Sequence, residues 1–73
     1  MKGATQMKKS ISINGQKIKV GDLIRIEYMH GEPQYDGKTG IVVTIDDAFQ
    51  LHGTWGGCAV IPEVDEIVVI KEA

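Results

Sequence analysis

The first regular pattern in the chain is an alternation of apolar and polar residues on both sides of the pair Asn14-Gly15. Asn and Gly both accept the positive φ angles of a type I′ turn, whose twist matches a two-residue hairpin. The pattern therefore predicts a hairpin over residues 10–20. Its expected cross-strand pairs join Ile11 and Ile13 to Ile18 and Val20.

A second stretch of alternation covers residues 23–29. Ile24, Ile26 and Tyr28 fall on one face of this stretch, and we expect that face to point into the core. Residues 30–40 contain three Gly and one Pro, which predicts a long polar loop. Loops of this kind, held by a rigid scaffold, often carry recognition.

The second half of the chain holds short apolar runs that turn residues separate. The β-branched run 41–45 is stopped by residues 46–48 and answered by residues 49–52, which predicts a second hairpin. A glycine-rich bend follows at residues 53–57. The remaining expected elements are a strand at 58–61, a tight turn at 62–65 and a strand at 66–70.

The composition favours strands over helices. Ile and Val together number 17, whereas Leu occurs twice and Ala four times, and nine Gly interrupt the chain. Branched side chains lose rotamer freedom in a helix and fit a pleated sheet. Five or six short strands at this spacing predict an all-β fold, a small barrel that leaves few open sheet edges. A chain of 73 residues has room for one such domain, which we place at residues 10–73.

Several classes of protein are not expected from this composition. The chain has no apolar run long enough to cross a bilayer, and its first residues lack the apolar stretch of a secretory signal, so we expect no membrane contact and a cytoplasmic location. Cys58 is the single cysteine, which leaves no internal disulfide to support the fold. Because so small a core contributes only about a few kcal/mol of net stability, a homo-oligomer joined through residues 10–20 is a further expectation.

Charge is distributed unevenly along the chain. The net charge is −2, but residues 1–25 hold six Lys or Arg and one Asp, whereas residues 26–73 hold two Lys and nine Asp or Glu. Residues 1–9 lack apolar periodicity and are interpreted as a flexible basic arm. An acidic body repels a phosphate backbone, so the charges favour a protein partner with a basic surface over nucleic acid. In the nucleic-acid alternative, the contacts come from Lys2, Lys8 and Lys9.

The order of the predicted elements resembles an SH3-like barrel, and the spacing of Gly21-Asp22, Gly37 and Gly40 resembles the opening of KOW-type barrels. A wider pattern is made up of Gly21-Asp22, Met29, Gly37, Gly40, Ile45-Asp46-Asp47-Ala48, His52, Trp55, Gly57 and Ile61-Pro62 with Val64-Asp65. By these positions, residues 20–70 resemble a family of short proteins of unknown function from Gram-positive bacteria, their phages and integrative elements. The resemblance implies an SH3-like barrel, extended here by the N-terminal hairpin, and a mobile-element setting. It implies no catalytic residue.

The polar residues do not form a set that predicts catalysis or a resident metal. Asp46 and Asp47 are neighbours in a turn, where Asp hydrogen-bonds its own backbone, and contact with an ion or a basic partner is the alternative. His52 and Cys58 lack the second pair of ligands that a tetrahedral zinc site needs, and Cys58 is interpreted as a small core side chain. We therefore expect no enzyme activity, no metal and no cofactor.

The aromatic residues are the remaining candidates for contact. Phe49 is expected in the core. Tyr35 and Trp55 lie in segments where SH3-like barrels clamp an extended peptide or stack on a base; for Tyr35, contact and loop packing stay open, and for Trp55, packing is favoured. The predicted contact set is Tyr35, Trp55, His30 and His52, with Asp46 and Asp47 as an electrostatic guide for a basic partner.

Together these features predict a non-enzymatic binding module that acts by protein–protein contact and is encoded by a phage or another mobile element. One alternative is a phage counter-defence protein. It would inhibit a host nuclease, as anti-CRISPR proteins do, or sequester a nucleotide signal. The other alternative is an RNA- or DNA-binding KOW-like module that uses the basic arm.

Overall fold

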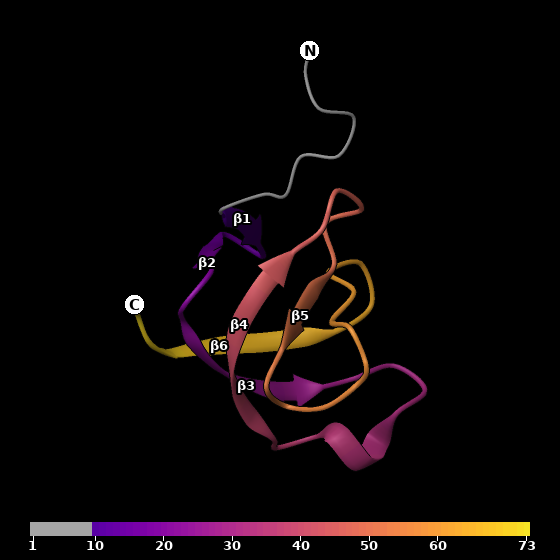
Figure 1. Ribbon diagram of the computed structural model, residues 1–73. Coiled ribbons are helices and arrows are strands. Elements are labelled where there is room, and N and C mark those ends of the chain that lie inside the picture. The colour runs from indigo at the N-terminus through magenta and orange to yellow at the C-terminus, as the bar shows by residue number, and fades with distance from the viewer. Residues whose placement is uncertain (1–9) are drawn as a thin grey trace.

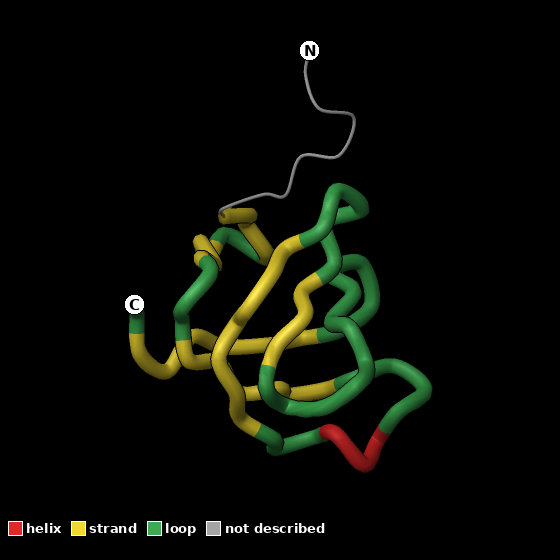
Figure 2. The backbone as a smooth tube through the Cα atoms, viewed as in Figure 1, coloured by secondary structure: helices red, strands yellow, loops and turns green. Residues whose placement is uncertain are grey.

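The computed structural model describes residues 10–73, and the predicted arm at 1–9, with Lys2, Lys8 and Lys9, lies outside the described residues. The described chain is all-β, with a single short 3₁₀ turn (Figures 1 and 2). Its elements are β1 (Ser10–Ile13), β2 (Gln16–Lys19), β3 (Leu23–Tyr28), η1 (Pro33–Tyr35), β4 (Thr39–Ile45), β5 (Leu51–Gly53) and β6 (Glu66–Lys71). The prediction of an all-β domain with short strands and an N-terminal hairpin is confirmed.

The strands form two antiparallel sheets. Strands β1 and β2 make a two-stranded ribbon, and the other four lie in the order β5-β4-β3-β6. Only Leu23–Arg25 of β3 pair with β4, and the sheet bends there, so that β4 and β5 run across β3 and β6 in Figure 1. Within residues 10–73, no helix has the length and apolar composition needed to cross a membrane.

The core is a cluster of side chains from both sheets. Ile18, Ile24, Ile26, Ile45, Leu51 and Val60 are fully buried. The cluster is completed by Ile13, Met29, Val42, Trp55 and Ile67. Because Ile13 and Ile18 come from the β1–β2 ribbon, the hairpin is part of the packed domain.

The Asn14-Gly15 turn forms as predicted, with φ values of 53° and 80°. The turn holds only two residues, so Ile13 pairs with Gln16 and Ile11 with Ile18. The expected pairing of Val20 is wrong: Val20 follows the end of β2 and is 41% exposed.

Strand β3 departs from the predicted alternation at its end. Ile24 and Ile26 point inward as predicted. Between Ile26 and Tyr28 the register with β6 shifts by a β-bulge, which turns the next inward position into Met29 and leaves Tyr28 42% exposed. The prediction that Tyr28 continues the inward face is therefore wrong.

The second hairpin also differs from the prediction in its details. Strand β4 begins two residues earlier than expected, at Thr39. Phe49, predicted in the core, precedes β5 and is 50% exposed. Residues 58–61 contribute only an isolated bridge between Val60 and Leu51, because the chain turns again at Ile61, whose carbonyl accepts hydrogen bonds from Val64 and Asp65.

Two buried carboxylates fasten loops to the sheet. Asp22 Oδ2 accepts a hydrogen bond from the Lys19 N–H at 2.8 Å, and Oδ1 accepts one from the Ala73 N–H at 2.9 Å. Asp65 accepts hydrogen bonds from the N–H groups of His30 (2.8 Å) and Ile61 (2.7 Å). Each carboxylate therefore joins segments that are distant in the sequence.

Trp55 is buried beneath the glycine bend, with 4% of its surface exposed, and its indole N–H donates to the Cys58 carbonyl at 2.7 Å. A Cβ at Gly40 would lie 2.7 Å from the backbone nitrogen of Trp55 and 3.1 Å from its indole Cε3 atom, and one at Gly53 would overlap the indole ring and the Ile41 carbonyl. The glycines thus make room for the indole, as the favoured packing interpretation of Trp55 required.

Replacing Asp22 tests the first carboxylate. Burial raises its pKa, but the N–H groups of Ala73 and Lys19 and the Lys19 ammonium outweigh burial and lower the pKa below 3.8. A lowered folded-state pKa stabilises the fold above the unfolded value, and this contribution is lost as the pH falls through the folded value. We expect Asp22→Asn to cost about 1–3 kcal/mol in urea denaturation at pH 7, and the difference from the parent to shrink below about pH 4.

Asp47→Asn, at an exposed position, is the control for this variant. Its free energy of unfolding should stay within about 0.5 kcal/mol of that of the parent. If the difference in the free energy of unfolding between Asp22→Asn and the parent stays the same from pH 7 down to about pH 3 and below, the charged form of Asp22 does not stabilise the fold.

Replacing Gly53 tests the packing of Trp55. Gly53→Ala should lower the free energy of unfolding by about 1–3 kcal/mol, because the added methyl overlaps the indole and the Ile41 carbonyl. Gly57→Ala is the matched control, since nothing lies within 4 Å of a Cβ at that position. Equal stability of the two variants in a thermal melt followed by Trp fluorescence would rule out this packing.

Candidate functional site

The predicted contact residues do not gather at one place. Trp55 is buried in the core, so it presents no ring face to a partner. His30 is exposed after β3, where its ring stacks edge-on against Tyr28 with centroids 6.4 Å apart, and it lines a hollow of about 320 Å³. Tyr35 lies in η1, and His52, Asp46 and Asp47 belong to the second hairpin.

Tyr35 packs its ring against the glycine bend. The side chain is half-buried beside the core, and a Cβ at Gly56 would lie 2.7 Å from its Cε1 atom. The neighbouring Cys58 thiol and partial burial raise the pKa of the Tyr35 hydroxyl. Lys38 Nζ lies 5.9 Å from the ring centroid. Of the two interpretations of Tyr35, these contacts support loop packing.

Asp46 organises the turn of the second hairpin. Its Oδ1 accepts hydrogen bonds from the N–H groups of Ala48 (2.9 Å) and Gln50 (3.0 Å). Its Oδ2 lies 2.8 Å from His52 Nε2, and the hydrogen bond with His52, followed by that from Gln50, lowers the pKa of Asp46. The capping role predicted for an Asp in this turn is therefore present in Asp46, while Asp47 is exposed.

The same turn holds Phe49 in an unusual backbone conformation. Phe49 N donates to Asp46 O and Asp46 N donates to Gln50 O, each at 3.0 Å, which is the pattern of a three-residue loop whose last residue is left-handed. Phe49 has a φ of 65°, a region that favours Gly or Asn and is strained for a bulky residue. Half of its side chain is exposed. This backbone position places the Phe49 ring at the protein surface and not in the core.

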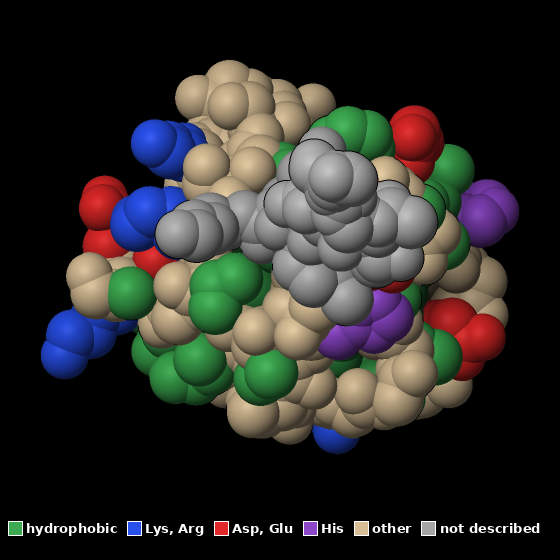
Figure 3. Space-filling view, turned by 45° about the horizontal axis from the view of Figure 1, so that its top comes forward, with side chains coloured by type: hydrophobic (Ala, Val, Ile, Leu, Met, Phe, Trp, Pro, Cys, Tyr) green, Lys and Arg blue, Asp and Glu red, His purple; other side chains and the backbone are tan. Residues whose placement is uncertain are grey.

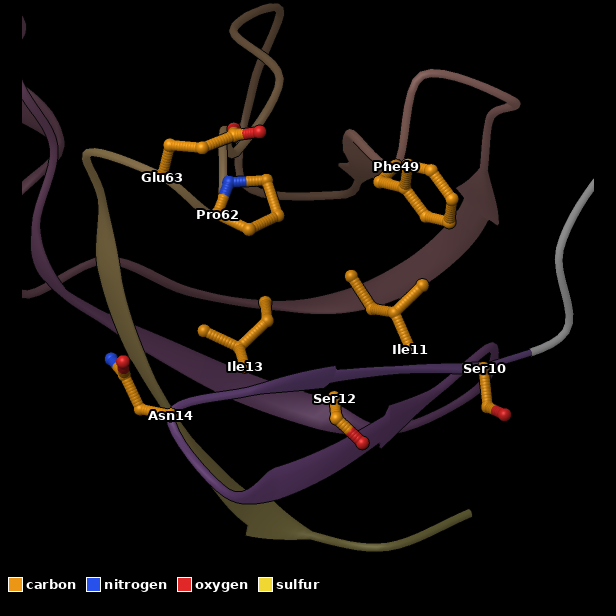
Figure 4. Close-up of a pocket in the computed structure, with 8 residues that line it drawn as sticks. All are labelled: Ser10, Ile11, Ser12, Ile13, Asn14, Phe49, Pro62 and Glu63. Carbon is orange, nitrogen blue, oxygen red and sulfur yellow. The ribbon is translucent and has the colours of Figure 1, made fainter.

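Phe49 lines one side of a groove that runs along the first strand. This groove, which we name the hairpin groove, has a volume of about 460 Å³. Its walls are formed by Ser10, Ile11, Ser12, Ile13, Asn14, Phe49, Pro62 and Glu63. In Figure 4, Ile11 and Ile13 point from β1 toward Phe49 and Pro62, whereas Ser12 points away from them.

The hairpin groove is apolar inside and acidic at its margin. Of the described residues that line the groove, Glu63 is the charged one, and the exposed Asp47 belongs to the same turn as Phe49. On the face in Figure 3, most of the Lys and Arg side chains lie at the left beside some acidic ones, and further Asp and Glu side chains lie at the right. A ligand of this groove would therefore meet an apolar floor and negative charge.

The sequence pattern does not predict this site, because it places Phe49 in the second strand of the second hairpin, at residues 49–52. The signal was present: Asp46-Asp47-Ala48 already contains the three positions of a type I turn, so the next residue falls at the left-handed position. An aromatic residue at a position that favours Gly indicates a surface side chain that the backbone does not require. Within residues 10–73, no three His, Cys, Asp or Glu side chains gather as a set that could hold a metal ion.

Comparisons with known proteins add no relative to this picture: no family model, no curated protein and no solved structure matches the chain. The resemblance to SH3-like and KOW-like barrels therefore stays a prediction of the sequence.

A pair of variants tests the strain at Phe49. Phe49→Ala and Phe49→Gly both remove the ring, but Gly also relieves the left-handed backbone. We expect Phe49→Gly to be more stable than Phe49→Ala by about 1 kcal/mol, measured by urea denaturation. Phe49→Gly should also stay within about 1 kcal/mol of the parent, because relief of strain offsets the lost half-buried ring. An alanine variant as stable as the glycine variant would contradict the strain.

Proposed function

We propose that this protein is a non-enzymatic binding module whose hairpin groove holds a segment of a protein partner. The observation that carries the proposal is Phe49, half-exposed at the groove on a backbone that disfavours it. Aromatic side chains at the centre of an apolar depression are the usual anchors of protein interfaces. The groove's volume of about 460 Å³ lies within the range of about 300–1,000 Å³ that is typical of ligand sites.

The partner segment is apolar and carries Lys or Arg. Its apolar side chains would cover Ile11, Phe49 and Pro62, which are the apolar surface of the groove that water still reaches. A flanking basic side chain would lie beside Glu63 and Asp47. Such rim charges mainly steer the encounter and set specificity, while the apolar contact provides most of the affinity.

The same charges do not support the nucleic-acid alternative for this groove. Among residues 10–73, no Lys or Arg lines it, and binding to a phosphate backbone depends on such cations. Lys2, Lys8 and Lys9, the residues of that alternative, lie outside the described residues. The mobile-element setting is part of the proposal, and its test is the identity of the genes that flank the coding sequence.

Selection from a randomised peptide library on the immobilised full-length protein tests the groove. We expect selected peptides to share apolar residues next to Lys or Arg, to bind with a micromolar Kd, and to bind Phe49→Gly at least about tenfold more weakly. Glu63→Gln should weaken binding by about threefold at low salt and less at high salt.

Glu66→Gln is the charge-matched control for the rim, because Glu66 is exposed on β6 and does not line the groove. It should leave the affinity within about twofold. The proposal fails if no peptide is selected, or if the selected peptides bind the parent and Phe49→Gly equally well.

A further inference from the structure

One edge of strand β1 carries no neighbouring strand within the part of the chain that the structure describes. The ribbon consists of β1 and β2 alone, and β1 pairs with β2 through Ser10–Ile13 and Gln16–Lys19. Every residue of β1 also lines the hairpin groove. The open edge and the groove are therefore parts of one surface.

The hydrogen bonds of Lys19 show which backbone groups of β1 point outward. Lys19 N donates to the Asp22 carboxylate and Lys19 O accepts from Asp22 N, so Lys19 exchanges no backbone hydrogen bonds with its partner Ser10. Antiparallel pairs alternate between hydrogen-bonded and non-hydrogen-bonded types. Ser12 and Lys17 are thus also a non-hydrogen-bonded pair, and the backbone N–H and C=O groups of Ser10 and Ser12 point to the open edge.

The two edges of the four-stranded sheet, β6 and β5, are covered at their centres. The Gln16 side chain occupies the outer edge of β6: its Nε2 donates to Ile67 O at 3.2 Å, and its Oε1 accepts from Val69 N at 2.8 Å. At β5, Leu51 and Val60 exchange two backbone hydrogen bonds of 2.9 Å. Among residues 10–73, β1 is the strand edge that lies open beside an apolar groove.

We infer that the partner segment binds as an added β-strand along β1, hydrogen-bonded to the backbone of Ser12 and Ser10; this inference rests on the proposed function. Addition of a strand to an open sheet edge is a recurring mode of peptide recognition, in which alternate side chains give specificity. Strand alternation places every second side chain of the partner on the face of Ile11 and Ile13, where Phe49 and Pro62 lie.

The inference defines the chemistry of the ligand. It is an extended peptide with apolar residues at alternate positions, polar residues between them and a Lys or Arg beside Glu63. The intervening polar side chains point with Ser12 away from the groove (Figure 4). A third strand also stabilises a two-stranded ribbon, which is marginal by itself.

Substitution of Ser12 separates strand addition from simple groove filling. Ser12→Pro removes the outward N–H but no hydrogen bond to β2, so the hairpin can keep its register. We expect this variant to bind the selected peptide at least about tenfold more weakly, whereas Ser12→Ala, which keeps the N–H, binds within about twofold of the parent. Urea denaturation verifies that both variants are folded.

A second measurement uses the parent protein, so it tests strand addition even if Ser12→Pro does not fold. Two N-methylated versions of the selected peptide are made. One carries the methyl groups on the odd-numbered residues of the peptide, and the other carries them on the even-numbered residues. Strand addition predicts that one set abolishes binding and the other set is tolerated, because only one set of amides faces β1.

Three outcomes would overturn strand addition. If Ser12→Pro and both N-methylated sets bind normally while Phe49→Gly does not, the groove binds a peptide but not as a strand. If light scattering shows a dimer that the peptide dissociates, a second copy occupies the edge. If removal of residues 1–9 increases the peptide affinity at least about tenfold at high salt, where charge attraction is screened, residues 1–9 occupy it.

Failure to select any peptide would overturn the proposed function and this inference together.

Discussion

The turn at Asn14-Gly15 has room for only two residues, and this constraint sets the position of every side chain in the first hairpin. Because Ile13 must pair with Gln16, Ile13 and Ile18 enter the core. The same register aims the amide of Gln16 at β6. A slip of one residue would reverse both faces of the ribbon. The groove, the covered edge of β6 and the open edge of β1 therefore all depend on two backbone angles that Gly and Asn adopt at low cost.

Aspartate side chains stabilise many of the turns and chain crossings of this small domain. Asp22, Asp36, Asp46 and Asp65 each accept hydrogen bonds from backbone N–H groups of turns or neighbouring segments. Hydrogen bonds to a charged acceptor are stronger than neutral ones, and they satisfy backbone groups that bends in the sheet leave unpaired. Part of the acidic composition is thus structural. The acidic side chains that remain exposed to solvent include Asp47 and Glu63.

The sequence predicted those parts of the fold that local chemistry decides. The first hairpin follows from Asn14-Gly15 and its flanking alternation, and the inward face of Ile24 and Ile26 follows from the period of two. Tyr28 and Phe49 were misplaced because each follows an irregularity, a β-bulge and a left-handed residue, that breaks the period. The hairpin groove was not predictable, since it joins β1 to Phe49 and Pro62 through tertiary packing.

The contact between Gln16 and β6 has a consequence for the stoichiometry of any complex. A side-chain amide that reproduces the hydrogen bonds of a strand terminates the sheet as a cap does, so that further chains cannot stack there. Growth from a single direction gives a finite assembly, whereas growth from two opposite directions gives a fibre. The glutamine thus closes β6 to an added strand, even though nearly a quarter of the residues are isoleucine or valine, 17 of 73.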